Sequence, residues 1–520
     1  MIPRIRQYRL ILVPEAANLP TNAPDNKKKR MSTETIIFIG VSIYMLGMIA
    51  VGLYASRKTH TVGEFMVAGR GLPLWICSFT VMATWFGGST IMGGAGAAYS
   101  DGMLGVIEDP WGGALALLLV GFFFARTFRR LRIITVADFM EQRYGRLAAI
   151  AITITQVFAN TVWVASMLVG FALIFKSLTG IPMDVGIYSG AVIIVFYTAI
   201  GGMWAVALTD FIQMCIILVG LVVLFTVVWF NIGGWGAIAP HLGEHTFRMI
   251  PLDNTLDQWL NYLRAWTIIG LVDISSQTLF QRVASAKSER VAQNAFYFGG
   301  FGYLVFGMIP VLLGIIGSVT MPELEDTEGV IPAMMVEYLH PVAVAVFVGA
   351  LLAAIMSSAD SALLAVGSLI GKNVLSMVKR DATPQLSLLV TRAAIPVAGI
   401  VAVFVAKNVR EVYTLMVDSN ILGLAVIIVP FILGVWWSKA NRTGALTGMA
   451  AGIAAWLITM QVAPAWPADF MGLAACLVTM LVVTPLTQKF DPPHEIRDID
   501  GNVVDMNDRL GTLPVFGSKS

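Results

Sequence analysis

The chain has 520 residues, of which 57% are hydrophobic and only 13% are charged, with a mean hydropathy of +0.77. Soluble domains carry about 25% charged residues, so this composition excludes a water-soluble fold and predicts an all-α integral membrane protein in a lipid bilayer. The net charge of +2 is too small to suggest a nucleic-acid partner, and three cysteines in separate apolar stretches suggest neither disulfides nor a zinc site.

Residues 1–33 precede the first apolar segment and include a basic run at 27–30. The short apolar patch at 10–13 is too short for a signal sequence or a membrane span. We expect this region to be a disordered basic tail, or a misassigned start ahead of Met31.

Thirteen segments approach the length of about 20 mostly apolar residues that a span requires. They lie near 34–55, 73–99, 110–127, 148–176, 182–200, 204–230, 258–281, 294–320, 341–374, 388–406, 411–437, 443–463 and 468–487. We therefore predict a transmembrane domain over 34–487 and a polar tail over 488–520, with no soluble catalytic domain between the spans.

The distribution of basic residues among the loops predicts the orientation of the chain in the membrane. Alternate loops, counted from the one after the first span, hold eighteen lysines and arginines, and the opposite loops hold four. Arg282 is counted among the eighteen as a loop residue. Because basic loops remain in the cytoplasm, we expect the N-terminus outside, the C-terminal tail in the cytoplasm, and an inner (cytoplasmic) membrane location.

Two spans carry helix-breaking or polar residues at their centres. The segment 82–99 contains Gly87 and Gly88, and the segment 264–282 contains Gly270 and Asp273. Paired interrupted helices in the two halves of a transporter point to its binding site. The alternative for each segment is close helix packing through small residues.

Several predicted spans contain acidic residues, and one of them also carries a group of serines. These residues are Asp210, Asp273, Asp360 and Asp418, with Ser357, Ser358 and Ser361. A charge at mid-membrane is costly and usually functional, although each acid could instead be a hydrogen-bonded structural group. Carboxylate, carbonyl and hydroxyl oxygens together suit a hard cation such as sodium.

Enzyme motifs are missing from the sequence: it has no HExxH, CxxC or GxSxG, and no glycine-rich dinucleotide loop. We therefore expect no enzymatic activity, and no cofactor besides sodium as a coupling ion.

Four runs are typical of one family: MATWFGGSTIMGGAGAAY, GGMWAVALTDFIQ, LFQRVASAKSERVAQ and LLAAIMSSADSALL. In this order they resemble the sodium/solute symporter family, and in their motifs they are most similar to high-affinity choline transporter-like members. The resemblance implies a LeuT-type fold of 5+5 inverted repeats, with repeat one at about 73–230 and repeat two at about 258–437.

The resemblance also implies the sites. The main sodium site would use the carbonyls of Ala83, Phe86 and Ala354 and the hydroxyls of Ser357 and Ser358. A second sodium position would use Asp210, Ser361 and Asp360. The substrate site would use Trp85, Trp163, Asp273, Ser276 and Gln277, although Gly113 and Ser276 stand where choline transporters carry further aromatic residues.

These features together predict sodium-coupled symport of a small organic solute, such as an amine, a quaternary ammonium compound or a zwitterion. A carboxylate in the interrupted span, Asp273, suits an ammonium group. Two alternatives remain at this point: a proton-coupled symporter of a small carboxylate or amino acid, and a transporter-like solute receptor.

Overall fold

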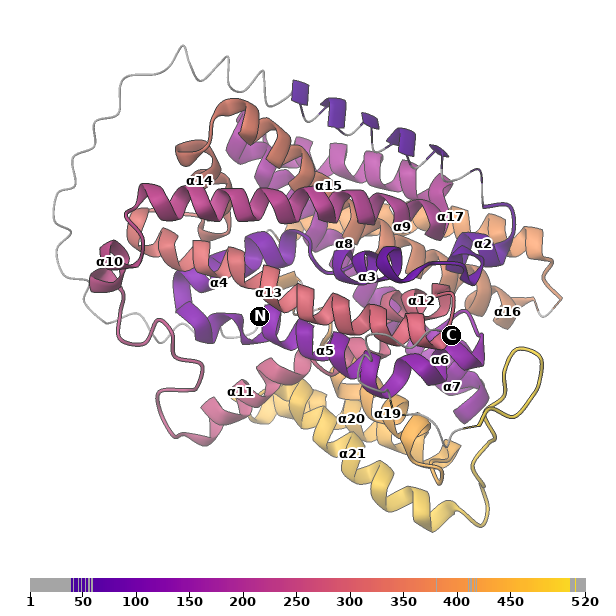
Figure 1. The fold of residues 1–520 in the computed structure, drawn as a ribbon. Helices are drawn as coiled ribbons and strands as arrows, with labels where there is room; N and C mark the ends of the chain where they lie inside the picture. The colour runs from indigo at the N-terminus through magenta and orange to yellow at the C-terminus, as the bar shows by residue number, and fades with distance from the viewer. Residues whose placement is uncertain are drawn as a thin grey trace.

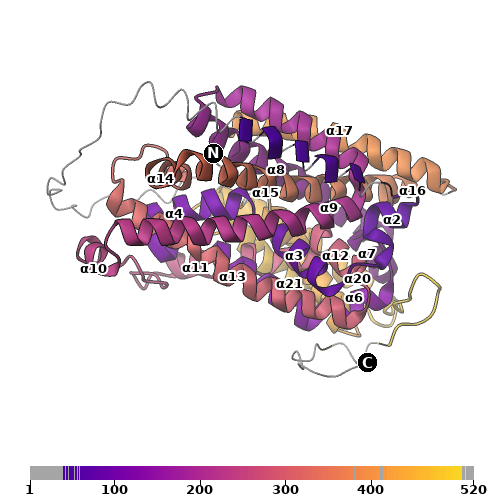
Figure 2. The same ribbon diagram turned by 45° about the horizontal axis from the view of Figure 1, so that its top comes forward.

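The computed structural model describes residues 39–505 and residue 510, apart from 41, 45, 48, 52, 55, 56, 58, 380, 410, 412, 413, 416 and 418. This part of the chain contains helices and two isolated β-bridges, and no strand. The longest helices lie side by side along one direction (Figures 1 and 2). The predictions for residues 1–33 and Asp418 lie outside the described residues.

The α-helices are α2 (Val62–Val67), α3 (Leu74–Ala83), α4 (Gly94–Asp101), α5 (Gly113–Leu119), α6 (Ala125–Leu131), α7 (Val136–Tyr144), α8 (Arg146–Thr179), α9 (Met183–Asn231), α10 (Trp235–Ile238), α11 (Leu256–Ile268), α12 (Gln277–Ser285), α13 (Glu289–Thr320), α14 (Val330–Tyr338), α15 (Pro341–Ser368), α16 (Leu375–Val378), α17 (Pro384–Asn408), α19 (Ile428–Trp436), α20 (Arg442–Val462) and α21 (Ala468–Thr487). Short 3-10 or π-helical turns are η1 (Ala68–Arg70), η2 (Ser89–Gly93), η3 (Gly102–Val106), η4 (Ile107–Gly112), η5 (Val120–Phe124), η6 (Ala239–His241), η7 (Val272–Ser275), η8 (Thr327–Gly329), η9 (Leu369–Val374) and η10 (Gly423–Ile427).

Eight helical stretches among the described residues are long and apolar enough to cross a membrane, and four shorter apolar helices accompany them. Helices suit this setting because they satisfy every backbone polar group within one segment. Large apolar side chains such as Ile400, Phe404 and Val462 are exposed on the outside of the bundle. The all-α membrane fold is thereby confirmed, and the count of thirteen spans stays a prediction.

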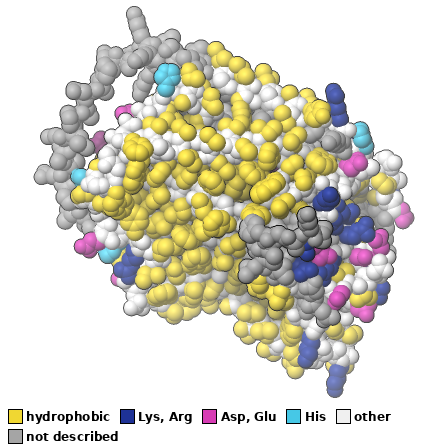
Figure 3. Space-filling view, viewed as in Figure 1, with side chains coloured by type: hydrophobic (Ala, Val, Ile, Leu, Met, Phe, Trp, Pro, Cys, Tyr) yellow, Lys and Arg dark blue, Asp and Glu magenta, His cyan; other side chains and the backbone are white. Residues whose placement is uncertain are grey.

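Apolar and charged side chains occupy different parts of the surface along the helix direction. Most of the face in Figure 3 is hydrophobic, and lysine and arginine side chains gather toward the end where α6 and α7 lie in Figure 1. The segment after α21 returns to the same end, where Arg132 Nη1 contacts Asp500 Oδ2 at 2.5 Å. This is the end that the basic residues predict to be cytoplasmic.

The segments predicted as spans 182–200 and 204–230 form one helical stretch, α9, that bends at Gly202. Gly202 has φ +62°, which is in the left-handed region that side chains disfavour. A Cβ at this position would lie 2.9 Å from the ring of Phe65 and 3.1 Å from its carbonyl oxygen. Glycine thus allows the bend and the close approach of α2.

We predict that Gly202→Ala destabilises the protein by about 1–3 kcal/mol, because the backbone is strained and Phe65 must move. The melting temperature of the purified protein in detergent would fall. Gly63→Ala in α2 is the matched control, since nothing lies within 4 Å of its Cβ position and its φ is not positive. Equal melting temperatures for the two variants would contradict the assignment of the bend to Gly202.

Both interrupted spans are confirmed. Helix α3 ends at Ala83, four residues form a turn, and the helix resumes through η2 into α4. Helix α11 ends at Ile268, η7 follows, and α12 begins at Gln277. The segment before α3 also pairs with the end of α12 and the segment after it, since Leu72 N donates to Ser285 O and Lys287 N donates to Leu72 O, both at 3.0 Å. The two interrupted helices are therefore joined directly.

Candidate functional site

The break after α3 lies directly against α15. Ser358 Oγ donates a hydrogen bond to the carbonyl oxygen of Ala83 at 3.1 Å. The approach requires glycine in the break, because a Cβ at Gly87 would lie 2.6 Å from Ser358 Oγ. The structure therefore brings together the two halves of the predicted main sodium site, one from each predicted repeat.

The remaining members of this predicted site are buried around the same contact. Phe86 lies in the turn that follows Ala83, and Ala354 lies one helical turn before Ser358, on the same side of α15. Ser357 points elsewhere, because its Oγ donates to Asp210 Oδ1. The carbonyl and hydroxyl oxygens at Ala83 and Ser358 are the ligand types that a sodium ion prefers.

Asp210 lies at the centre of a second buried polar group. Its carboxylate accepts hydrogen bonds from Thr80 Oγ1 and Ser357 Oγ. Arg282 Nη2 lies 3.6 Å from Asp210 Oδ2, and both side chains are fully buried. The same guanidinium donates to Ser361 Oγ. Asp210 thus forms an ion pair with Arg282, and hydroxyl groups supply the other contacts of its carboxylate oxygens.

The position of Arg282 corrects the topology prediction. It does not lie in a loop, because α12 extends through it and the side chain has no exposed surface. Arg282 also interacts electrostatically with Asp360. A guanidinium therefore already lies among Asp210, Ser361 and Asp360, the residues predicted to hold a second sodium ion. The physical reason is that charges buried together in a low dielectric are stabilised by pairing.

We predict that Arg282→Met destabilises the protein by about 3–5 kcal/mol, because Asp210 is left buried without its cation. The double variant Asp210→Asn with Arg282→Met should recover much of this loss in thermal unfolding. Glu495→Gln removes the acid of an exposed pair with Arg497 and should change stability little. A double variant as unstable as the sum of its two single variants would contradict the pairing.

Three aromatic rings form a cluster next to the break. The ring centroids of Trp85 and Trp163 are 6.1 Å apart, and those of Trp85 and Tyr303 are also 6.1 Å apart. Trp85 and Trp163 are both buried, and among the described residues the Nε1 atoms of the two indoles have no hydrogen-bond partner. The predicted tryptophan pair is thus brought together, and Tyr303, from α13, completes a partial cage that the sequence analysis missed.

Two carboxylates border this cluster. Asp273, in the break between α11 and α12, accepts a long hydrogen bond of 3.5 Å from Asn420 Nδ2. Asp109 accepts from Tyr303 OH at 2.5 Å and from Thr90 Oγ1 at 2.8 Å. The two carboxylates interact electrostatically with each other, and neither forms an ion pair with a lysine or arginine in the described part of the chain.

The sequence does not predict a role for Asp109, because the third predicted span begins at residue 110 and the acid precedes it. The structure places it inside η4 and buries it. The sequence Glu108-Asp109-Pro110, directly at the start of an apolar segment, is the feature that could have indicated a buried acid.

Ser276 and Gln277 have local structural roles. Ser276 Oγ caps α12 by accepting from the backbone N–H of Leu279 at 3.3 Å. Gln277 is bonded through its backbone N–H to Gln156 Oε1, and its own Oε1 accepts from Val136 N, both at 2.9 Å. These contacts fix the second break, and they leave Gln277 engaged within the protein.

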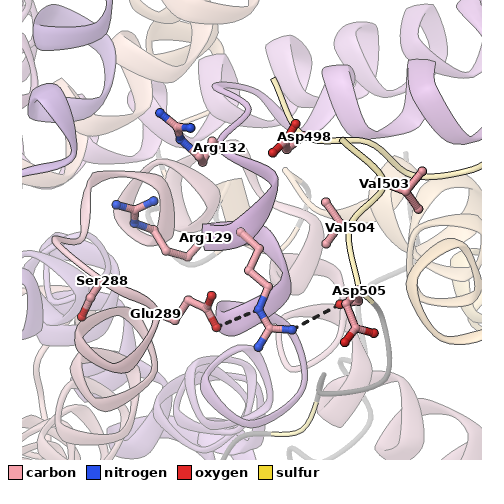
Figure 4. Close-up of a pocket in the computed structure, with 9 residues that line it drawn as sticks. Arg129, Arg132, Ser288, Glu289, Asp498, Val503, Val504 and Asp505 are labelled. Atoms are coloured by element: carbon pink, nitrogen blue, oxygen red, sulfur yellow. Dashed lines mark hydrogen bonds and ion pairs between the residues drawn. The ribbon is translucent and has the colours of Figure 1, made fainter. Parts of the chain in front are cut away.

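A cleft of about 490 Å³ lies at the predicted cytoplasmic end, where the segment after α21 covers α6 and the start of α13 (Figure 4). Its arginines are already bonded: Arg129 Nε donates to Ala286 O at 2.6 Å, and Arg130 Nε contacts Glu289 Oε2 at 2.8 Å. Its charges are therefore largely paired internally, and we assign it to the docking of the C-terminal segment.

Comparisons with known proteins show the family of this chain. The model of the sodium:solute symporter family matches residues 65–452. The chain belongs to this family. A high affinity choline transporter from Homo sapiens is 30% identical over 444 residues, which cover 80% of this chain and 75% of the relative. An osmoregulated proline transporter from Bacillus subtilis is 28% identical over 456 residues, which cover 82% of this chain and 89% of the relative.

The solved structures that resemble this symporter share its fold. A Na+-coupled sialic acid symporter aligns with a TM-score of 0.75 at 21% identity, covering 88% of this chain and 98% of that one. Mhp1, a nucleobase-cation-symport-1 family transporter, aligns with a TM-score of 0.58 at 15% identity, covering 82% and 95%. The LeuT-type fold is confirmed, and family membership makes this chain a sodium-coupled symporter of small solutes.

Proposed function

We propose that this symporter carries a small nitrogen-bearing organic solute into the cell with one sodium ion, which binds between Ala83 and Ser358. The observation that carries this proposal is the 3.1 Å contact between the Ala83 carbonyl and Ser358 Oγ. It joins a broken helix of repeat one to a helix of repeat two at a fully buried position. An ion held there would stabilise one arrangement of the two repeats over another.

Coupling follows from where the ion and the solute lie. Trp85 comes two residues after Ala83 in the same break, so a sodium ion that fixes this backbone also fixes the indole against the solute. The inward movement of one charge across about 100 mV supplies ~2.3 kcal/mol. That energy is available for accumulation only if ion and solute cross together.

Sodium is a better coupling ion than a proton for this site. Asp210 is the acid whose protonation a proton-coupled cycle would use, and Thr80, Ser357 and Arg282 are all donors to its carboxylate. Because the Arg282 guanidinium already compensates this acid, we propose a single sodium ion per cycle.

The solute class is supported by the aromatic cluster and by Asp273. Indole faces attract cations, and a buried carboxylate without a basic partner suits an ammonium group. The relatives in Homo sapiens and Bacillus subtilis are named for choline and proline, which both carry a cationic nitrogen. We therefore favour a cationic amine or a related solute over an acidic one.

We further propose a cytoplasmic membrane location with the C-terminal segment inside. Arg264 in α11 contacts Glu108 at 3.4 Å and Asp469 at 2.9 Å, and this ion-pair group would close the outer side above Asp109. Opening toward the outside would then require these contacts to separate. The chain carries out transport under this proposal, with sodium as coupling ion and no cofactor.

We predict that Ser358→Ala raises the sodium concentration for half-maximal binding about tenfold, because one ion–oxygen contact worth about 1.5 kcal/mol is lost. Binding of ²²Na⁺ to the purified full chain measures this directly. Ser318→Ala is the matched control, since it removes a hydroxyl that also bonds a helix carbonyl, at 2.8 Å, away from the site.

Uptake into proteoliposomes distinguishes the remaining alternatives. We expect an inward sodium gradient to drive accumulation of a labelled amine that the protein binds. Accumulation driven by a pH gradient with sodium absent would favour the proton-coupled alternative. Sodium-dependent binding without counterflow of the labelled amine would favour a solute receptor.

A further inference from the structure

The pair formed by Asp109 and Asp273 has no role in the proposed sodium site, and neither acid pairs with a lysine or arginine in the described part of the chain. Two other acids inside the bundle have basic partners. The buried Asp210 contacts Arg282, and the partly buried Asp138 contacts Lys372 Nζ and Asn373 Nδ2. Burial raises the pKa of Asp138, but the contacts with Lys372, Thr135 and Asn373 outweigh it and hold that pKa below its ordinary value.

Asp109 and Asp273 are held close together by the packing of their backbones. A Cβ at Gly112 would lie 3.4 Å from the amide nitrogen of Gly270, so the η4 segment packs against the break after α11. Asp109 is three residues before Gly112, and Asp273 is three residues after Gly270. The two carboxylates therefore come from segments in direct contact, which accounts for their mutual electrostatic interaction.

The aromatic cluster converges on the same place. A Cβ at Gly113 would lie 3.1 Å from Asp109 Oδ1, 2.9 Å from Cε1 of Tyr303 and 3.2 Å from Cε3 of Trp85. Trp85 and Trp163 each present an indole N–H that is buried and without a partner among the described residues. Buried donors normally have a partner, so these indoles independently indicate a position that a ligand or water fills.

The donors around the two acids differ. Each Asp109 oxygen accepts one hydrogen bond, from Tyr303 or from Thr90, which fixes the orientation of the carboxylate. Asp273 accepts only the long contact from Asn420 in the described part of the chain. A carboxylate oxygen has two acceptor positions, so both acids retain capacity for N–H donors.

Two carboxylates in one buried site cannot both be ionised unless positive charge lies between them. A quaternary ammonium ion could supply charge, but it has no N–H to donate. A zwitterion would bring a third carboxylate into a site where no described arginine or lysine pairs with either acid. An organic cation with two separate ammonium groups satisfies both the charge and the hydrogen bonds.

We propose that the solute is a short alkyl diamine, with one ammonium group donating to Asp273, the other to Asp109, and its carbon chain against the rings of Trp85 and Tyr303. This inference rests on the proposed function and names the substrate class for the same site.

The test uses the purified full chain in sodium-containing buffer, with the melting temperature and ²²Na⁺ binding as separate readouts. The probes are the α,ω-diamines with two to five carbons, the monoamine 1-aminobutane, and choline. We expect at least one diamine to bind about tenfold more tightly than 1-aminobutane, since a second charge-assisted hydrogen bond is formed. Diamines that bind no better than 1-aminobutane or choline, or do not bind, overturn the inference.

The variant Asp109→Asn tests whether Asp109 binds the second ammonium group. We expect it to reduce the diamine affinity to that of 1-aminobutane while sodium binding stays at the wild-type level, which shows that the variant is folded. Asp257→Asn, at an exposed position in α11, is the matched control and should leave all affinities unchanged. A diamine preference that survives in Asp109→Asn overturns the assignment. Sodium-independent binding in the wild-type chain would instead contradict the proposed function.

Discussion

The hydroxyl of Ser358 donates a hydrogen bond to the carbonyl oxygen of Ala83 and so joins two helices. In a continuous helix this carbonyl would accept a backbone N–H of its own helix instead. A carbonyl becomes available at this depth only because α3 stops at Ala83, and α15 can approach it only because Gly87 has no side chain. Backbone of this kind is tolerated inside a membrane where it is buried in protein or lines a cavity. The proposed ion site and the position of the neighbouring indole both depend on this one interruption.

The buried charges fall into two groups with opposite properties. Around Asp210, the charge is compensated within the protein by Arg282 and by hydroxyl groups, so this region holds the helices together without a ligand. Around Asp109 and Asp273, the protein supplies aromatic rings and hydroxyl groups but no counter-charge among the described residues. A cationic solute, as proposed, would bind in the second kind of region, because a fully compensated site would gain little from binding a cation.

Sequence patterns predicted the elements that local chemistry determines. The helical bundle, the two interruptions, the pairing of Ala83 with Ser358 and the proximity of Trp85 to Trp163 followed from hydropathy, glycine positions and the family motifs. Arg282, Asp109 and Tyr303 could not be placed in the same way. Arg282 is only nine residues beyond the break at Asp273, so sequence counting put it at the membrane surface, and only its pairing with Asp210 across the bundle explains its burial. Asp109 and Tyr303 come from segments 194 residues apart, and their contact depends on tertiary packing.

We propose that a single sodium ion binds at the contact between the first break and α15, while Arg282 supplies the cation at Asp210. Equilibrium binding of ²²Na⁺ to the purified chain, with the protein concentration known, tests this most directly. We expect saturation at one ion per chain with a non-sigmoidal binding curve. Saturation at two ions, or the absence of saturable sodium binding, would contradict it.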